Sequence, residues 1–321
     1  MQAALVDHSG ATPTYGEIAD PQAGDGLVRV RVSAASLSPV TKSRAAGTHY
    51  SSTAARGFVP GVDGVGRLDD GRRVWFAMPQ DPYGALAPWS LVDPRRCVPV
   101  PDGVDDVVAA AIAIPGMSAW AALQERARFV AGGTVLVNGA TGTSGGLAVQ
   151  VARRLGAARV IATGRNPQAL ERLAAAGADA VVSLAQPPAA LAQAFATQFE
   201  AGVDVVLDYL WGPSAETALL AAARAAPAGR PLRFVQIGAA SASDITLPGA
   251  VLRSSSIELL GSGMNSVPFP RLLGAVAAVL AAAAAQPFDV AIEEAPLARV
   301  GELWDRPDGS PRIVLRSDAA A

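Results

Sequence analysis

The chain has 321 residues, of which half are hydrophobic, and its formal net charge at pH 7 is −2. This length favours two domains, and the near-neutral charge argues against a basic nucleic-acid surface or a polybasic membrane patch. Cys97 is the single cysteine, which excludes a disulfide within the chain. With this single cysteine and only two histidines, His8 and His49, the chain cannot form a structural four-cysteine zinc site, and a catalytic cysteine–histidine zinc is not expected.

The apolar segments predict no membrane span. The longest apolar run, Leu272 to Ala285, is shorter than the ~20 residues that cross a bilayer and is typical of a buried helix. The first residues lack a charged region and a long apolar core, so we expect no signal peptide and a cytoplasmic location.

The first hundred residues are typical of β structure with loops. Leu27 to Ala35 alternates valine with charged residues, the period of a half-buried strand, and short apolar runs follow at 74–77 and 89–92. From Asp105 an alanine-rich helix is expected, which Pro115-Gly116 separates from a second helix near 118–128.

The most informative segment is 134–155. An apolar, β-branched run at 134–137 stops at Gly139, Gly142 and Gly145, and an amphipathic helix, 147–155, follows at once. A buried strand, a glycine turn and a helix start place a pyrophosphate on the N-terminus of the helix. A second strand at 159–163 completes a βαβ unit, which makes a dinucleotide site the preferred interpretation.

The end of this second strand distinguishes the two nicotinamide dinucleotides. An NAD site usually has an acidic residue there, whereas this chain reads Thr163-Gly164-Arg165-Asn166. The fork-shaped guanidinium of Arg165 suits a 2′-phosphate, so the sequence favours NADPH. The alternative is an ordinary surface arginine in an arginine-rich chain.

Beyond this point helices and strands alternate, which predicts a six-stranded, doubly wound parallel sheet. Asp208, at the end of one strand, would either touch a ribose or cap the next loop. The final strand, 312–315, is expected to return to the first domain. The predicted helices are 167–176 and 213–225, and the predicted strands are 180–183, 204–207, 232–237 and 257–261.

Several short motifs carry a family resemblance over nearly the whole length. They are Val30 to Gly47, Pro60-Gly61-Val62-Asp63-Gly64-Val65-Gly66, Gly71-Arg72-Arg73-Val74, Gly84-Ala85-Leu86-Ala87, Gly139 to Gly145 with Gln150, and Gly177-Ala178-Asp179. With these motifs the chain resembles the medium-chain dehydrogenase/reductase superfamily, in particular its zinc-independent, zeta-crystallin-like quinone oxidoreductase branch.

The resemblance implies an α/β protein with a GroES-like, mainly β catalytic domain formed by 1–112 and 288–321. A Rossmann domain with a doubly wound parallel sheet would occupy 113–287. It further implies a homodimer that transfers a hydride from NADPH to an electron-poor small molecule, a quinone or an α,β-unsaturated carbonyl compound. The cofactor residues expected from motif and family position are Ser118, Gly139, Gly142, Thr143, Ser144, Gly145, Thr163, Gly164, Arg165, Asn166, Ile237, Gly238 and Ser262.

The chain departs from the family in the expected active-site segment. Ser38-Pro39-Val40-Thr41 stands where Asn-Pro-x-Asp is common, Ser43 replaces a common tyrosine, and the hairpin between Gly66 and Gly71 is short. The candidate catalytic residues are therefore Tyr50, Ser38, Thr41 and Lys42, with Tyr50 preferred because a phenol can donate a proton to a developing enolate. As alternatives, Tyr50 packs on the domain edge, Lys42 is a solvated helix residue, His49 is a loop histidine, and Cys97 is a small buried hydrophobe.

Two other classes remain open. The glycine turn also occurs in short-chain dehydrogenase-like proteins, but it then lies near the N-terminus, and Lys42, the only lysine, completes no Tyr-x-x-x-Lys pair. The second alternative is a family member that binds NADPH without turnover and acts as a redox sensor. The residues at Ser38, Thr41 and Ser43 motivate this interpretation.

Overall fold

The computed structural model describes residues 1–50, 52, 56–307 and 311–317 and contains two compact units. Unit 1 comprises Met1–Ile114 and Val276–Ala321, and unit 2 comprises Pro115–Ala275. The chain leaves unit 1 within helix α2 (Asp106–Ala121) and returns within α8 (Phe269–Ala285). Both boundaries between the units therefore fall inside helices.

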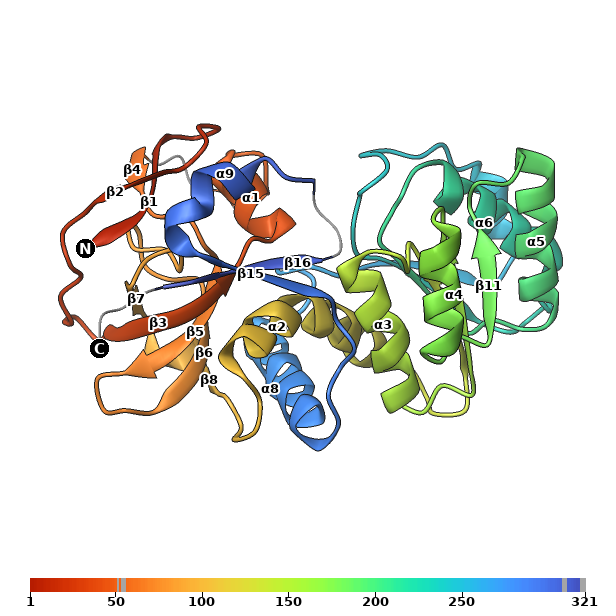
Figure 1. The fold of residues 1–321 in the computed structure, drawn as a ribbon. Coiled ribbons are helices and arrows are strands. Elements are labelled where there is room, and N and C mark those ends of the chain that lie inside the picture. The colour runs from red at the N-terminus through yellow and green to blue at the C-terminus, as the bar shows by residue number, and fades with distance from the viewer. Residues whose placement is uncertain (51, 53–55, 308–310, 318–321) are drawn as a thin grey trace. The chain divides into compact units, whose positions relative to one another are not determined.

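Unit 1 is built mainly from antiparallel strands (Figure 1). One sheet has the order β15-β16-β3-β5-β6-β8, with β7 also paired to β3, and a second has the order β2-β1-β4. The last strand pairs antiparallel with β3, Val314 opposite Ser36, so the end of the chain completes a sheet begun near its start. The strands are β1 Gln2–His8, β2 Thr14–Glu17, β3 Val28–Ser36, β4 Arg56–Phe58, β5 Asp63–Leu68, β6 Arg73–Ala77, β7 Trp89–Val92, β8 Cys97–Pro99, β15 Ile292–Pro296 and β16 Arg312–Arg316.

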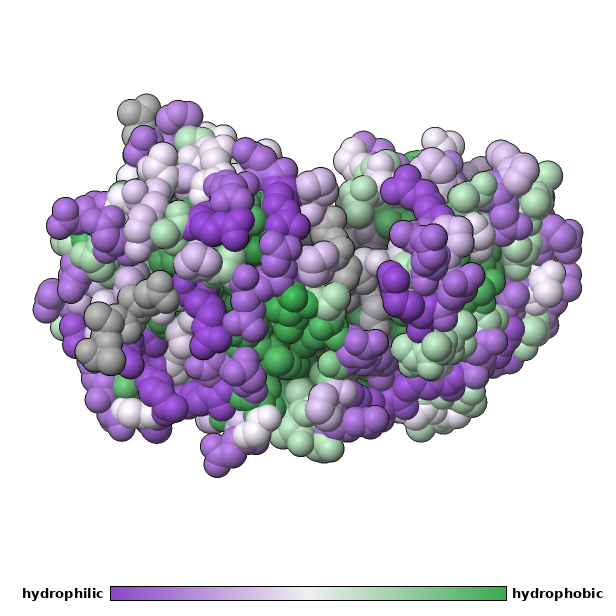
Figure 2. All heavy atoms as spheres, in the orientation of Figure 1, coloured by the Kyte–Doolittle hydropathy of each residue, from purple (hydrophilic) through white to green (hydrophobic). Residues whose placement is uncertain are grey.

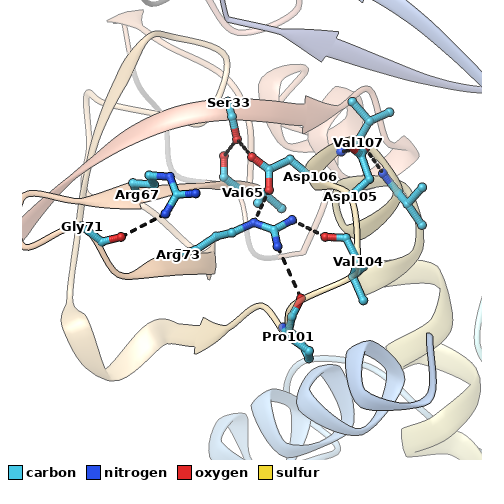
Figure 3. Close-up of polar contacts among 11 residues, drawn as sticks. Ser33, Val65, Arg67, Gly71, Arg73, Pro101, Val104, Asp105, Asp106 and Val107 are labelled. Carbon is cyan, nitrogen blue, oxygen red and sulfur yellow. Dashed lines mark hydrogen bonds and ion pairs between the residues drawn. The ribbon is translucent and has the colours of Figure 1, made fainter. Parts of the chain in front are cut away.

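A polar cluster joins the sheet of unit 1 to the first turn of α2. Arg73 Nε donates to Asp106 Oδ1 at 2.5 Å, and Ser33 Oγ donates to the other oxygen of that carboxylate (Figure 3). The same guanidinium donates to the carbonyl oxygens of Pro101 and Val104. Strands β3 and β6 thus hold the start of the helix through one carboxylate.

The short helical segments of unit 1 are α1 Pro39–Ala45, η1 Pro94–Arg96, η3 Leu297–Arg299 and α9 Val300–Trp304.

Unit 2 contains a six-stranded parallel sheet in the order β11-β10-β9-β12-β13-β14. Numbered along the chain this order is 3-2-1-4-5-6, the arrangement of a dinucleotide-binding Rossmann fold, and the predicted doubly wound sheet is confirmed. The strands are β9 Thr134–Asn138, β10 Arg159–Gly164, β11 Ala180–Ser183, β12 Val205–Asp208, β13 Leu232–Gln236 and β14 Ile257–Gly261.

Helices cover this sheet because each has one apolar face. Phe195 and Phe199 of α5 and Leu219 of α6 pack on Leu136 and Val206 of the sheet, and all five are buried. Helix α3 contacts β9 and β10, and helix α4 contacts β10 and β11. The helices of unit 2 are α3 Thr143–Arg154, α4 Pro167–Ala175, α5 Pro188–Glu200, α6 Pro213–Ala225 and α7 Gly249–Arg253.

The expected helix break at Pro115 is wrong. Helix α2 runs through this proline and continues as a π-helical turn, Ala122–Arg126. A proline inside a helix removes one hydrogen bond and crowds the carbonyl four residues earlier, at a cost of about 3 kcal/mol. Burial of the surrounding alanines, among them Ala109 to Ala111, offsets this cost.

The stretch Asp106–Arg126 is long and apolar enough to cross a bilayer by length and composition alone. However, 67% of its apolar window is buried inside the protein, as in the core helix of a globular fold. On the face drawn in Figure 2, hydrophilic residues are spread over each unit between smaller apolar areas.

Candidate functional site

The glycine turn of unit 2 begins where β9 ends. Gly139 has a φ of +91°, and Gly142 is the N-cap of α3. The first helical hydrogen bond runs from Gly146 N to Gly142 O at 2.8 Å. Amides in the first turn of a helix have no partner four residues back, so this end of α3 offers donors and the positive end of a helix dipole to an anion.

The three glycines of the turn have different roles. A Cβ on Gly139 would lie 2.7 Å from the Leu210 side chain, and one on Gly145 would overlap the carbonyl oxygen of Gly139. A Cβ on Gly142 would meet nothing within 4 Å, and its φ of −87° is ordinary for any residue. The fold therefore requires Gly139 and Gly145, whereas Gly142 leaves open space in front of the helix.

A buried polar network lies beneath the turn. Asn138 Nδ2 donates to Asp208 Oδ1 at 2.8 Å and to Ser214 Oγ at 3.0 Å. Thr163 Oγ1 donates to Asn138 Oδ1 at 2.8 Å and accepts from Gly139 N at 3.1 Å. The hydroxyl of Thr163 and the amide of Gly139, both predicted cofactor groups, therefore bond to the protein itself and position the turn.

Asp208 caps the loop that follows β12, which is one of the two roles the sequence left open for it. Its carboxylate accepts from Leu210 N at 3.1 Å and from Trp211 N at 3.1 and 3.2 Å. Burial raises the pKa of Asp208, and the hydrogen bonds from Asn138 and from the two amides oppose this shift. The sequence did not identify Asn138, because its partners come from strands that are distant in the chain.

The end of β10 holds the residues expected at the adenosine phosphate. A Cβ on Gly164 would overlap the Thr141 side chain, so this glycine lets the turn approach β10. Arg165 is exposed and makes no hydrogen bond or ion pair with any residue that the structure describes. Asn166 is the N-cap of α4, and its Oδ1 accepts from Ala169 N at 3.1 Å.

The remaining predicted cofactor residues of unit 2 lie on α2 or at strand ends. Ser118 Oγ donates to Pro115 O at 2.7 Å and lies 3.3 Å from the hydroxyl of Tyr209, a buried residue that the sequence did not single out. Burial raises the pKa of Tyr209, and the hydrogen bond with Ser118 opposes this shift. Backbone amides at the strand ends are engaged: Ile237 N and Gly238 N bond to Asp208 O, and Ser262 N bonds to Gln236 O.

The candidate catalytic residues lie in unit 1, and most of their polar groups are occupied. Ser38 is the N-cap of α1: its Oγ accepts from Thr41 N at 3.0 Å and donates to Thr41 Oγ1 at 2.9 Å, and both side chains are buried. Lys42 Nζ donates to Arg306 O at 2.8 Å. Tyr50 is 63% exposed and its ring centroid lies 4.1 Å from that of His49. Tyr50 is therefore the most exposed of the four candidate residues.

A small cavity of about 50 Å³, open to solvent, lies in unit 1, and Thr41 is the one candidate catalytic residue among its described lining residues. Two charged residues line it that the sequence did not single out, Arg44 and Asp81. Arg44 follows Thr41 by three positions on α1, a spacing that shares a helix face and could have identified it. The described lining residues are Thr41, Arg44, Ala45, Phe58, Val59, Pro60, Gly61, Val62, Met78, Pro79, Asp81 and Gly84.

No three His, Cys, Asp or Glu side chains group as a metal site would require, among the residues that the structure describes. Burial raises the pKa of the Cys97 thiol to about 11, so the thiolate form that would bind a metal is disfavoured near neutral pH.

Comparisons with known proteins agree with this architecture. A family model described as "Zinc-binding dehydrogenase" matches residues 145–283, a segment that contains none of the chain's cysteine and histidine residues. A probable NADPH-dependent quinone reductase of Emericella nidulans is 30% identical over 358 residues, covering 98% of this chain and 99% of that protein.

Solved structures share the fold over 98% of this chain, and two quinone oxidoreductases are among them. The quinone oxidoreductase of Thermus thermophilus, also solved as its complex with NADPH, is 27% identical with a TM-score of 0.79 over its whole chain. A mycobacterial quinone oxidoreductase is 22% identical with a TM-score of 0.82 over 99% of its chain. The family predicted from the sequence motifs is confirmed: this chain belongs to the medium-chain dehydrogenase/reductase superfamily, where it groups with the quinone oxidoreductases.

Proposed function

We propose that the protein is an NADPH-dependent oxidoreductase that reduces a quinone or an α,β-unsaturated carbonyl compound without a metal ion. The observation that carries the proposal is the arrangement at the ends of β9 and β10. There Gly142 leaves space before the start of α3, and the exposed Arg165 follows β10 where an NAD site would have an acid. The NADPH-dependent quinone reductase of Emericella and the quinone oxidoreductase of Thermus, solved with NADPH, support the choice of NADPH and of a quinone.

The residues of unit 2 divide into groups by the part of the cofactor that they would hold. Gly142, Thr143 and Ser144 would bind the pyrophosphate through the N-terminus of α3, and Gly164, Arg165 and Asn166 would surround the 2′-phosphate. Ser118, Ile237, Gly238 and Ser262 would lie by the ribose and nicotinamide. Gly139, Gly145 and Thr163 would keep the turn in shape.

The proposed chemistry needs little from the protein beyond position and a proton. When bound, NADPH supplies a hydride, so that with one proton from the protein or solvent the acceptor gains two electrons and two protons. Tyr50 would donate that proton from its hydroxyl, and the cavity of unit 1 would take the acceptor. The described residues include no group of side chains that could hold a metal ion as a Lewis acid. An acceptor that is already electron-poor therefore suits the site better than a simple ketone, which needs such polarisation.

We further propose that 1–112 with 288–321 form the GroES-like catalytic domain and 113–287 the cofactor domain. A homodimer is supported by β14, which lies at the edge of its sheet and exposes Leu259, because unpaired strand edges pair readily with another copy. A cytoplasmic location suits the single free thiol, which stays reduced there.

One experiment tests the proposal and separates it from a silent, redox-sensing family member. The sensor alternative is favoured by the Ser38–Thr41 hydrogen bond, which occupies two candidate catalytic hydroxyls. Nicotinamide fluorescence would be titrated with NADPH and NADH in parallel, and 1,4-benzoquinone would then be added beside a protein-free control. Preferential NADPH binding with enzyme-dependent oxidation supports the reductase. Binding without oxidation of NADPH across a panel of quinones and enones supports the sensor, and no binding rejects both.

A further inference from the structure

A pair of hydroxyl groups joins α2 to the end of β12 within unit 2. Ser118 Oγ donates to Pro115 O at 2.7 Å and lies 3.3 Å from the hydroxyl oxygen of Tyr209, the residue that follows β12. Ser118 is half-buried, whereas the Tyr209 side chain is buried. Within the described part of the chain, these are the hydrogen bonds that the two hydroxyl groups make.

The direction of both hydrogen bonds follows from the number of protons. A hydroxyl group has one proton and donates once, whereas a carbonyl oxygen only accepts. Ser118 uses its proton on Pro115 O, so the phenol of Tyr209 must donate the second hydrogen bond to Ser118 Oγ. Both protons of the pair are then committed within the protein, and Ser118 Oγ keeps one lone pair as an acceptor. A ligand that completes the pair must therefore donate a hydrogen bond to Ser118.

The backbone around Tyr209 is held by neighbouring segments. Tyr209 N donates to Asn138 O at 3.0 Å, and Tyr209 O accepts from Ala240 N at 3.3 Å. The next two amides of the loop bond to the carboxylate of Asp208, and a Cβ on Gly238 would lie 2.8 Å from Tyr209 O. The protein itself thus fixes the position from which the phenol reaches Ser118, which reduces the conformational entropy that a ligand must order at this pair.

The place of Tyr209 in the sheet relates the pair to one half of the cofactor. Strands β9 and β12 are neighbours at the point where the strand order reverses, and a dinucleotide binds across the carboxyl ends of the strands there. In the proposed placement, the 2′-phosphate lies at Arg165 after β10 and the pyrophosphate lies at Gly142 after β9. The nicotinamide half then extends over the ends of β12 and β13, which Tyr209 and Gly238 follow.

We propose that Tyr209 is a positioning residue that acts through Ser118. With Pro115 O, it fixes Ser118 Oγ as an acceptor for a hydrogen-bond donor of the nicotinamide half, either the carboxamide amino group or a ribose hydroxyl. The carbonyl oxygen of a quinone or an enone only accepts, so the pair holds the cofactor and neither binds nor protonates the acceptor. The inference rests on the proposed function because it takes NADPH as the ligand.

A double-mutant cycle on the full chain tests the inference without turnover. Calorimetry would measure the affinity for NADPH of the wild type, Ser118→Ala, Tyr209→Phe and the double variant. We expect Ser118→Ala to lower this affinity about threefold to tenfold, the worth of one hydrogen bond. Tyr209→Phe should lower the affinity in the wild-type background and have no further effect in the Ser118→Ala background, because it acts through the serine hydroxyl. Ser118→Thr keeps the hydroxyl and should retain most of the affinity.

A second ligand identifies which group of the cofactor donates. Reduced 3-acetylpyridine adenine dinucleotide phosphate carries a methyl group in place of the carboxamide amino group. If the amino group donates, the wild type should bind this analogue about threefold to tenfold more weakly than NADPH, and Ser118→Ala should weaken its binding no further. If a ribose hydroxyl donates, Ser118→Ala should weaken the binding of both ligands by the same factor. Tyr15→Phe removes an exposed tyrosine hydroxyl of unit 1 and is the matched control, with both affinities unchanged.

The outcomes distinguish this inference from the proposed function. An NADPH affinity of Ser118→Ala equal to that of the wild type would overturn the inference. A loss of the same size for Tyr209→Phe in both backgrounds would overturn it too, because Tyr209 would then act on the fold, an effect that urea unfolding of the same variants measures separately. If Tyr209 and Ser118 are coupled but no quinone or enone is reduced, the inference holds and the reductase function is wrong. A wild type that does not bind NADPH would reject both.

Discussion

Asn138 Nδ2 lies 2.8 Å from Asp208 Oδ1, and both side chains are fully buried at adjacent positions of β9 and β12. An ionised carboxylate only accepts, so Asn138 must turn its NH₂ toward Asp208 and its oxygen toward Thr163. The Thr163 hydroxyl then donates to that oxygen and accepts from Gly139 N. One carboxylate therefore sets the direction of every hydrogen bond as far as the glycine turn.

Replacing Thr163 tests this chain of hydrogen bonds. Thr163→Val keeps the shape but leaves the oxygen of Asn138 and the amide of Gly139 without their partner, which should lower the free energy of unfolding by about 1–3 kcal/mol. Thr163→Ser keeps the hydroxyl and should recover most of the loss. Urea unfolding of both variants measures the difference, and equal stability of the two variants would mean that the hydroxyl contributes nothing.

The glycines of the turn provide a matched pair of variants. Gly145→Ala places a methyl group against the Gly139 backbone and should destabilise the fold by about 1–3 kcal/mol. Gly142→Ala meets no protein atom, so its unfolding free energy should change by less than about 1 kcal/mol. The methyl group would nevertheless occupy the space proposed for the pyrophosphate. This steric overlap should cost about 1–3 kcal/mol of binding free energy and lower the affinity for NADPH about tenfold. Unchanged affinity in Gly142→Ala would place the pyrophosphate elsewhere.

Arg165 should discriminate between the two dinucleotides. Arg165→Ala should weaken NADPH binding by about 1.5–3 kcal/mol, the usual worth of a charge-assisted hydrogen bond, while NADH binding is retained. Fluorescence titration of the wild type and the variant with both cofactors measures this. Equal weakening of NADPH and NADH would show that Arg165 does not read the 2′-phosphate.

Asp63 of unit 1 should make stability depend on pH. Burial raises its pKa to about 6, although a hydrogen bond from Trp75 Nε1 at 3.1 Å and the charge of Arg312 both lower it. The folded protein therefore binds this proton more tightly than the unfolded chain, so the free energy of unfolding falls as the pH rises from about 4 to above 6. A pKa that is higher by about 2 in the folded protein corresponds to a loss of about 3 kcal/mol.

Asp63→Asn removes this titration and keeps an acceptor for Trp75. Urea unfolding at about pH 4.5 and pH 7.5, on either side of the raised pKa, should show that the variant gains stability relative to the wild type at the higher pH. Asp208, whose pKa is also raised, is present in both proteins, and its contribution cancels in the comparison. A difference between variant and wild type that is the same at both pH values would argue against a raised pKa for Asp63.

Local patterns in the sequence predicted the elements of unit 2 closely. The strands at 180–183 and 257–261 and the helix at 213–225 have the predicted bounds, because turn residues and apolar periodicity mark both ends of each. The break at Pro115 was predicted wrongly because tertiary burial outweighs the local propensity of a proline to end a helix.

Local patterns also predicted one part of the candidate site and missed another. The glycine turn and Arg165 lie within one βαβ unit, so their arrangement follows from short-range spacing. The Asn138 network and the placement of Arg44 and Asp81 at one cavity depend on segments that meet only in the folded chain. The periodicity of a sequence does not report contacts between segments that are distant in the chain. These residues could therefore not be singled out from the sequence.

The pairing of β16 with β3 has a consequence for synthesis on the ribosome. Residues 34–36 of β3 are made early, yet their partners at 314–316 emerge near the end of translation of this stretch. Unit 2, which lies in one continuous stretch, can fold before β16 has been made and has paired with β3 in unit 1. During that interval the nascent chain exposes an incomplete sheet edge, the kind of surface that chaperones shield from aggregation.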